Sequence, residues 1–187
     1  MTSSNPTAGG ASVGSGIGPK DIDEIVGVAK GYISRVGTGP FPTELTDEIG
    51  DTMIELGGEY GVVTGRRRRC GWLDLVALRY AVRVNSLTKL FITKLDILSA
   101  FDTIKVAVGY TSLGERYDHF PRQQRVLYNC TPIYEEFPGW KVDITGCRAF
   151  EDLPKEAQDY IEYIEESAGV PVGWISVGPE RQQLISR

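Results

Sequence analysis

Apolar residues recur at the spacing of an α-helix in three segments of the chain. Residues 21–34 combine this spacing with acidic residues in the first turn, where the helix dipole favours negative charge, so they are predicted to be helical. Residues 73–84 show the same periodicity, and a third helix is predicted from Pro154 to about Ser167, ending at Gly169. The residues expected to face inward are Ile22, Ile25, Val26, Ala29 and Ile33 in the first helix, Leu73, Val76, Ala77, Tyr80, Ala81 and Val84 in the second, and Ala157, Tyr160, Ile161 and Ile164 in the third.

Shorter apolar runs between these segments predict strands. Residues 90–98 are interpreted as a buried strand whose polar residues emerge at its end. Residues 105–110 alternate well enough for a second strand, and residues 170–179 predict a strand that enters a glycine turn. Weaker strands are expected at 133–137 and 141–144, inside an otherwise irregular stretch.

Turn-forming residues separate these elements. Residues 47–56 are predicted to form a short helix that stops at Gly57 and Gly58, and the prolines and glycines of residues 37–45 predict a loop. Residues 2–18 are rich in serine, glycine and alanine, which is typical of a flexible leader and also of loops that approach phosphate closely. Because helices and strands are intermixed along the chain, the predicted fold class is α/β.

Composition narrows the class of protein. Of the 187 residues, 41% are hydrophobic and 24% charged, which is the profile of a globular protein long enough to bury a core. The net charge of −5 argues against general nucleic-acid binding. Three widely spaced cysteines without a C-x-x-C pair predict reduced thiols and a cytoplasmic protein. No apolar run approaches the roughly 20 residues of a membrane span, and the first residues lack a signal-peptide pattern, so neither membrane insertion nor secretion is expected.

The first chemical signal is the sequence Thr93-Lys94-Leu95-Asp96 at the end of an apolar run. A carboxylate there can accept two parallel hydrogen bonds from N1–H and the exocyclic amine of guanine, while the lysine stem packs along the base. Adenine lacks this pair of donors, so such an aspartate would select guanine. The four residues alone favour the alternative of an ordinary surface pair at a strand end.

The second signal is a run of four arginines, Arg66–Arg69, preceded by Thr64 and Gly65. Adjacent guanidinium groups repel one another, so their concentration in an acidic protein indicates an anionic partner. Arginine is the side chain suited to bidentate capture of a carboxylate or a phosphate. The alternatives are a solvated loop and a nonspecific contact with nucleic acid.

Other chemistry is only weakly indicated. Ser176–Pro179 form a turn whose backbone could close over a purine ring, but four residues do not demand that role. His119 is the only histidine and is interpreted as a structural or surface residue. The sequence contains no G-x-x-x-x-G-K-[ST] phosphate loop and gives no basis for a Ser/His/Asp or Cys/His arrangement. We therefore assign no catalytic residue and no metal ligand.

Six motifs follow one another along the chain: TSSNPTAGG, RVGTGPFPTEL, TGRRRRCGWLD, TKLD, PIYEEFPGW and ISVGP. In this order, over residues 2–179, they resemble adenylosuccinate synthetase, and the pair RVGTGPFPTEL and TGRRRRCGWLD is the most specific part of the resemblance. The resemblance implies a fold like that of P-loop proteins, with a central, mostly parallel sheet and additional irregular segments. It also implies membership of a ligase family that acts in purine (AMP) biosynthesis.

The reaction that the resemblance implies begins when GTP phosphorylates the 6-oxygen of IMP. The amine of L-aspartate then displaces the phosphate, which gives adenylosuccinate, GDP and phosphate. The arginine run would neutralise the negative charge that converges on such a site. By the resemblance, the aspartate-binding loop comprises Val62, Val63, Thr64, Gly65, Arg66, Arg67 and Arg68, the IMP contacts are Thr2, Val36, Gly37 and Arg66, and the GTP contacts are Arg68, Lys94, Leu95, Asp96, Ser176, Val177 and Gly178.

The chain departs from the family pattern in its first residues. It lacks the phosphate loop with the catalytic aspartate, the histidine that assists phosphoryl transfer, and the ligands that position Mg²⁺. Because it opens at Met1 inside a family motif, residues 1–187 are expected to form one C-terminal portion of a synthetase-like domain, incomplete as a fold. Missing strands would leave an open sheet edge and exposed apolar faces. We therefore expect the isolated chain to be inactive and either poorly stable, partner-dependent or truncated.

The expected ligands are IMP, L-aspartate and GTP or GDP, and family members are typically homodimers whose active site is completed across the interface. Two other functions remain open. The chain could be a non-catalytic module that binds a guanine nucleotide or another anion through Lys94, Asp96 and the arginine loop. A contact of Arg66–Arg69 with nucleic acid is the weakest hypothesis, because the chain is acidic and aromatic residues do not alternate with the arginines.

Overall fold

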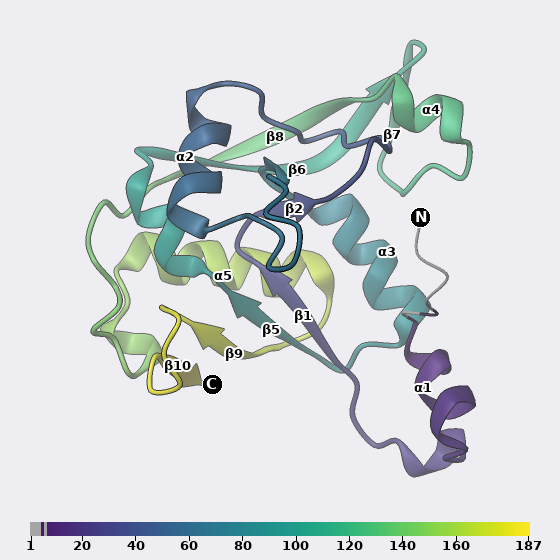
Figure 1. Ribbon diagram of the computed structural model, residues 1–187, viewed down its shortest axis with the longest axis horizontal. Coiled ribbons are helices and arrows are strands. Elements are labelled where there is room, and N and C mark those ends of the chain that lie inside the picture. Colours follow the sequence, from purple (N-terminus) through teal and green to yellow (C-terminus); the bar gives the residue numbers. More distant parts are fainter. Residues whose placement is uncertain (1–4, 6) are drawn as a thin grey trace.

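The main element of the computed structural model, which describes residue 5 and residues 7–187, is a four-stranded sheet (Figure 1). Its strand order is β1–β5–β9–β10. Strands β1 and β9 both run parallel to β5, and β10 pairs antiparallel with β9. The bounds are Val26–Lys30 for β1, Lys89–Thr93 for β5, Val172–Ser176 for β9 and Leu184–Ser186 for β10. The prediction of an α/β fold with a mostly parallel sheet is confirmed.

Two smaller sheets complete the strand framework. In the first, β6 pairs in parallel with β4 and antiparallel with both β7 and β8. In the second, β2 and β3 form an antiparallel pair. The bounds are Ile33–Arg35 for β2, Arg69–Gly71 for β3, Leu73–Asp74 for β4, Thr103–Ser112 for β6, Glu115–Tyr117 for β7 and Thr131–Pro138 for β8. The predicted strands at 105–110 and 133–137 are therefore present and longer than expected.

Helices α2, α3 and α5 confirm three sequence predictions. The α-helices are α1 (Ala8–Ser15), α2 (Glu48–Gly57), α3 (Leu75–Asn85), α4 (Gln124–Tyr128) and α5 (Lys155–Ala168). Asp47 and Asp74 cap α2 and α3 by accepting hydrogen bonds from backbone N–H groups of the first turn. All four residues predicted to face inward from α5 are buried, and Gly169 ends that helix in the left-handed conformation.

The buried face of α3 differs from the prediction. The helix begins at Leu75 because the two preceding residues pair with β6 and Asp74 serves as its cap. Its buried residues are Leu75, Val76 and Leu78, whereas Tyr80 and Val84 are exposed. The periodicity identified the helix but not which of its apolar residues the neighbouring elements cover.

The prediction of a helix at 21–34 is wrong, because this segment forms strands β1 and β2 after a 3-10 helix at Pro19–Asp21. Its branched residues suit a strand, and each of its two glycines would cost a helix about 1 kcal/mol. The backbone of residue 27 packs closely against Leu87, whose side chain would have to shift to make room for a β-carbon. Pairing with β5, more than 60 residues away, decides the outcome and leaves no local signature in the sequence.

Three further predictions need correction. The strand predicted at 90–98 ends at Thr93, and a 3-10 helix, Leu95–Ala100, takes up the remaining residues. Residues 141–144 form no strand. Within residues 2–18, which composition assigned to a flexible leader, the structure contains helix α1, although none of its residues is buried.

Strand β1 forms one edge of the main sheet. Within the described residues it pairs with β5 on one side only, and Val28 is 70% exposed. Two neighbouring hollows of about 340 Å³ each share Val28 and Ala29 in their linings. An unpaired edge next to exposed apolar residues is a surface that favours contact with another segment of protein.

Candidate functional site

The carboxyl ends of the parallel strands bring several chemically distinctive residues to one edge of the sheet. Lys30 ends β1, Thr93 and Lys94 follow at the end of β5, and Ser176 ends β9. Figure 1 shows the arrowheads of β1 and β5 directed to the same side, toward the end of α2. In open α/β sheets this is the edge at which ligands bind.

A buried carboxylate, Glu59, joins three cations at this edge. The Nζ atoms of Lys30 and Lys94 lie 2.6 and 3.2 Å from Glu59 Oε1, and Arg68 Nη1 lies 2.8 Å from Oε2. Tyr32 also donates its hydroxyl to Oε1 at 2.7 Å. The Glu59 side chain is 0% exposed, while those of its three cationic partners are 25–34% exposed. We call these five residues the Glu59 cluster.

The cations of the cluster decide the charge of Glu59. Burial, the largest influence, raises the pKa of this carboxyl, but hydrogen bonds from Lys30, Tyr32 and Arg68 outweigh it and lower the pKa to about 2. The same burial, followed by the hydrogen bond to Glu59, raises the pKa of Tyr32 far above its usual range. At neutral pH the cluster therefore contains one carboxylate, one neutral phenol and three cations.

Glycine at the end of α2 allows this arrangement. Gly57 lies so close to the Tyr32 hydroxyl that a β-carbon at this position would collide with it. The next residue, Gly58, has a φ of 56°, a left-handed conformation that glycine adopts at little cost. The chain can therefore leave α2 and bring Glu59 under the sheet edge within two residues.

Three of the four arginines in the run form ion pairs with carboxylates of this chain. Arg67 forms an ion pair with Asp51, Arg68 with Glu59, and Arg69 with Glu44, where Nε lies 2.6 Å from Oε1. Within the described part of the chain, no carboxylate pairs with Arg66. Internal carboxylates thus compensate three of the four positive charges, which counts against the interpretation of the run as a nucleic-acid patch.

The loop before the arginines projects from the molecule. The backbone N–H of Gly61 donates to the Arg66 carbonyl at 2.8 Å, and that of Gly65 donates to the Gly61 carbonyl at 2.7 Å. The side chains of Val62 and Val63 are 98% and 96% exposed. Two apolar side chains held in water have no role in the core, so this tip is available to a ligand or to another protein segment.

One residue of the predicted guanine-reading segment, Asp96, lines an open cavity, whereas Lys94 and Leu95 are not part of its wall. Asp96, Ile97 and Ser99 form part of the wall of a cavity of about 370 Å³, opposite Asp143 and Thr145. This volume lies within the range of small-molecule sites. Within the described residues no cation forms an ion pair with Asp96. Burial raises the pKa of this carboxyl, and backbone hydrogen bonds at Asp96 and Ile97, together with the charge of Lys94, partly offset the effect. A half-buried carboxylate without a paired cation can accept further hydrogen bonds from a ligand.

The Ser176–Gly178 turn connects to the same cavity. The backbone N–H of Val177 donates to the Gln183 carbonyl at 2.9 Å, and the amide of Gln183 donates to the Thr145 carbonyl at 3.3 Å. Ser176 Oγ donates to the Gly178 carbonyl at 2.7 Å, which fixes the turn. Thr145 lines the cavity with Asp96, so Gln183 links the turn to the cavity wall, although Ser176, Val177 and Gly178 do not line the cavity themselves.

The residues predicted to contact IMP are partly described. Val36 is exposed, and the Gly37 carbonyl accepts a hydrogen bond from Arg69 Nη1 at 2.8 Å, which ties this loop to the arginine run. Gly37 has a φ of 85°, as a tight turn requires. Thr2 lies outside the described residues, so the structure does not bear on its predicted role.

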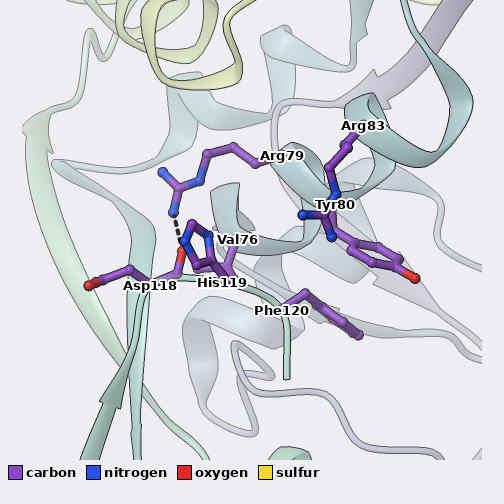
Figure 2. Close-up of a pocket in the computed structure, with 7 residues that line it drawn as sticks. All are labelled: Val76, Arg79, Tyr80, Arg83, Asp118, His119 and Phe120. Atoms are coloured by element: carbon purple, nitrogen blue, oxygen red, sulfur yellow. Dashed lines mark hydrogen bonds between the residues drawn. The ribbon is translucent and has the colours of Figure 1, made fainter. Parts of the chain in front are cut away.

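A further hollow of about 200 Å³ surrounds His119, away from these residues (Figure 2). Arg79 Nη2 donates to the backbone carbonyls of Val108 at 2.8 Å and Asp118 at 3.3 Å. Tyr80 and Phe120 stack with ring centroids 5.0 Å apart. None of the residues predicted to bind a ligand lines this hollow, and His119 is exposed, which agrees with its interpretation as a surface residue.

Three members of the Glu59 cluster, Lys30, Tyr32 and Glu59, were not predicted from the sequence. Lys30 and Tyr32 lay inside the segment that was predicted to be a helix, where a lysine at a strand end could not be recognised. Glu59 follows two glycines and carried no motif of its own. A usable signal is the short distance in sequence between Glu59 and the arginine run, because a buried carboxylate needs nearby cations.

Among the described residues, no group of three or more histidine, cysteine, aspartate or glutamate side chains could hold a metal ion. No helix in that part of the chain is both long and apolar enough to cross a membrane.

Comparisons with known proteins point to a single family. A family model described as adenylosuccinate synthetase matches residues 1–185. The chain is 57% identical over all 187 residues to an adenylosuccinate synthetase of Mycobacteroides abscessus, and 52% identical over 185 residues to one of Trichlorobacter lovleyi. It spans 43% of the length of both relatives. A solved structure of fully ligated adenylosuccinate synthetase from Plasmodium falciparum superposes with a TM-score of 0.96 and 42% identity, covering 100% of this chain and 45% of that one.

Proposed function

The chain belongs to the adenylosuccinate synthetase family, and we propose that it supplies the guanine, aspartate and part of the IMP contacts for GTP-dependent ligation of IMP to L-aspartate. The products of this reaction are adenylosuccinate, GDP and phosphate. The observation that carries the proposal is the meeting of the arginine run and Lys94 at the carboxyl edge of the sheet, through the shared partner Glu59.

Asp96 is the residue that reads guanine in this proposal. Its carboxylate faces a cavity large enough for a base and has no cationic partner among the described residues. Two hydrogen bonds from guanine would stabilise the charged form that burial disfavours. Leu95 and the turn formed by Ser176, Val177 and Gly178 would border the base.

The arginine loop binds the anionic groups. Arg66 has donors that no carboxylate of the described residues occupies, so it can bind both the aspartate and IMP. Arg68, held at the base of the loop, would contact GTP. The aspartate-binding loop comprises Val62, Val63, Thr64, Gly65, Arg66, Arg67 and Arg68. Thr2, Val36 and Gly37 complete the proposed contacts with IMP.

This chain offers binding groups rather than a catalytic acid or base. Mg²⁺ belongs to the reaction of the family, but no group of three or more acidic, histidine or cysteine side chains among the described residues could hold the ion. Charge neutralisation by preorganised donors is the contribution that its residues can make to phosphoryl transfer. We propose that the chain is inactive alone, that residues 1–187 are one C-terminal portion of a synthetase domain, and that the complete protein is a cytoplasmic homodimer.

A second candidate function is a non-catalytic module that binds a guanine nucleotide or another anion. It is favoured by one observation, that the Asp96 cavity and the Glu59 cluster form entirely from residues of this chain. The two functions share the guanine site and differ in whether another polypeptide is needed for turnover.

Calorimetric titration of the folded chain with GDP and ADP tests the guanine site. We expect GDP to bind more tightly than ADP. Asp96→Asn should weaken the affinity for GDP by about 10- to 100-fold and change the affinity for ADP by less than about 2-fold. Asp159→Asn is the matched control, because Asp159 is 50% exposed, pairs with Lys155 on the surface of α5 and does not line the cavity. An unchanged GDP affinity in Asp96→Asn would refute the role assigned to this carboxylate.

Complementation in trans tests the ligase function. The chain would be mixed with the remaining portion of the Mycobacteroides abscessus synthetase, and GTP hydrolysis would be measured with and without IMP. IMP-dependent hydrolysis that neither portion performs alone supports the ligase. A folded complex that binds GDP but never hydrolyses GTP supports the binding module instead.

A further inference from the structure

Glu59 lies between two parts of the proposed site that are distant in sequence. One carboxylate oxygen accepts from Arg68 Nη1 at 2.8 Å, and the other lies 3.2 Å from Lys94 Nζ. The contacts carried over from the family include Arg68 and Lys94 but not Glu59, which is buried beneath them. A buried residue of this kind acts on a ligand through the side chains it holds.

Lys94 is anchored at both ends. Its ammonium group donates to the Gly57 carbonyl as well as to Glu59, and its backbone has a φ of 56°, which is strained for a residue other than glycine. Such a conformation persists only where the surroundings impose it. With the ammonium fixed, the aliphatic stem has little freedom, and the charge of Lys94 acts to lower the pKa of Asp96, two residues further along the chain.

Arg68 is anchored along one edge. Its backbone N–H donates to the Glu59 carbonyl at 2.8 Å, and its Nη1 donates to the Glu59 carboxylate. Within the described residues, no hydrogen bond occupies its Nε or Nη2, and the side chain is 31% exposed. The planar guanidinium therefore presents a free edge in a fixed direction.

We propose that Glu59 is a positioning residue for the guanine nucleotide, which holds the Lys94 stem against the base and turns the free edge of Arg68 toward the phosphates. This inference rests on the proposed function. Glu59 itself touches no ligand. Its contribution is to reduce the side-chain freedom that the nucleotide would otherwise have to remove on binding.

The same carboxylate prevents the cations from repelling one another. Lys30, Arg68 and Lys94 approach it from different segments, and Asp96 is the other acid near Lys94. Tyr32 and Cys70 also lie near Glu59, but burial raises the pKa of both, that of Cys70 to about 11, so they stay neutral at physiological pH. Without Glu59, one of the two lysines should lose its proton more readily.

The experiment compares Glu59→Gln, Glu59→Asp and the control Glu44→Gln in the whole chain. Glu44 pairs with the neighbouring Arg69, so its variant makes the same chemical change in the same run of arginines without touching Lys94. GDP affinity would be measured by calorimetry between pH 6.5 and 9.5 on protein shown to be folded by circular dichroism. The ammonium groups of the lysines would be titrated in parallel by NMR without ligand.

We expect Glu59→Gln to weaken GDP binding at least ~10-fold at pH 7, with a further loss as pH rises. The wild type and Glu44→Gln should agree within about 2-fold at each pH. Glu59→Asp keeps the charge but withdraws it by about one carbon–carbon bond, so it should keep the fold and bind GDP less tightly than the wild type. If Glu59→Gln does not fold, Glu59→Asp still decides the question.

A purely structural role predicts a different result. Folded Glu59 variants would then bind GDP like the wild type at every pH, and this outcome would overturn the proposal. If the wild type does not bind GDP, the guanine site of the proposed function fails. The NMR titration then judges Glu59 separately: a shifted lysine pKa in Glu59→Gln supports its hold on the cations, and unchanged titrations overturn that as well.

Discussion

Glu59 and Asp96 are two shielded carboxylates near the same sheet edge, and their surroundings move their pKa values in opposite directions. Burial raises the pKa of both groups. At Glu59, hydrogen bonds from cations and Tyr32 reverse this effect and lower the pKa to about 2. At Asp96 no ion pair forms among the described residues, and the pKa stays raised.

The two carboxylates therefore differ in role: the charge of Glu59 is structural, whereas that of Asp96 is available to a ligand. Glu59 is satisfied by its own chain, so it fixes other side chains in place. Asp96 bears a desolvation cost that its backbone hydrogen bonds and Lys94 offset only in part, which is the condition under which a ligand's donors gain most. Strongly perturbed groups with such different partners often have different roles within one site.

Removing the Glu59 carboxylate should produce the largest effect on stability. Glu59→Ala leaves three clustered cations without their shared partner, and we expect the free energy of unfolding to fall by about 3 kcal/mol. This value is at the low end for broken buried ion pairs, because the cations are partly exposed to water. Urea unfolding followed by circular dichroism measures the change. Asp51→Ala, which removes an exposed pair with Arg67, is the control and should cost less than about 1 kcal/mol. Equal losses in the two variants would contradict a special role for the cluster.

Acid should remove the stabilisation that Glu59 provides. A carboxyl whose folded pKa is lowered stabilises the fold above its unfolded pKa, near 4.5, and loses that contribution as pH falls toward 2. The stability difference between wild type and Glu59→Gln should therefore be constant from pH 7 to about 5. It should then shrink by on the order of 2 kcal/mol as pH falls to 2. A difference that does not change with pH would mean that Glu59 is not charged in the folded chain.

The charge of Asp96 should change stability in the opposite direction to that of Glu59, and by the smallest amount. Because its folded pKa is raised, its charged form destabilises the ligand-free chain above that pKa, and the penalty disappears once pH falls below the unfolded value near 3.8. Asp96→Asn should thus be more stable than the wild type at pH 7 by roughly 0.5 kcal/mol. Unfolding curves at pH 7 and pH 3 measure the gap. A loss of stability at pH 7 would show that the carboxylate has a favourable partner.

Local sequence patterns predicted the elements whose signals lie within a few residues. Helix α5 was predicted with its inward residues and its terminal glycine, because a single helical face packs against the core there. The loop at 37–45 and the stop of α2 followed from glycine and proline chemistry. The segment 21–34 failed because its pairing partner β5 lies far away in sequence.

The candidate site was predicted in part for the same reason. The arginine run and Lys94–Asp96 were recognised from residue types that suit anions and guanine. Their meeting through Glu59 could not be predicted, because it depends on how the end of α2 passes beneath two parallel strands.

By itself, the sequence determined the α/β class, the family resemblance and the chemical character of the binding groups. These follow from periodicity, turn residues and side-chain chemistry, which are properties of short segments. Only the tertiary structure decided which cations share Glu59, that Asp96 lacks a paired cation in the described chain, and which sheet edge stays open. Each of these depends on contacts between distant segments, and such contacts set burial and charge pairing without leaving a local pattern.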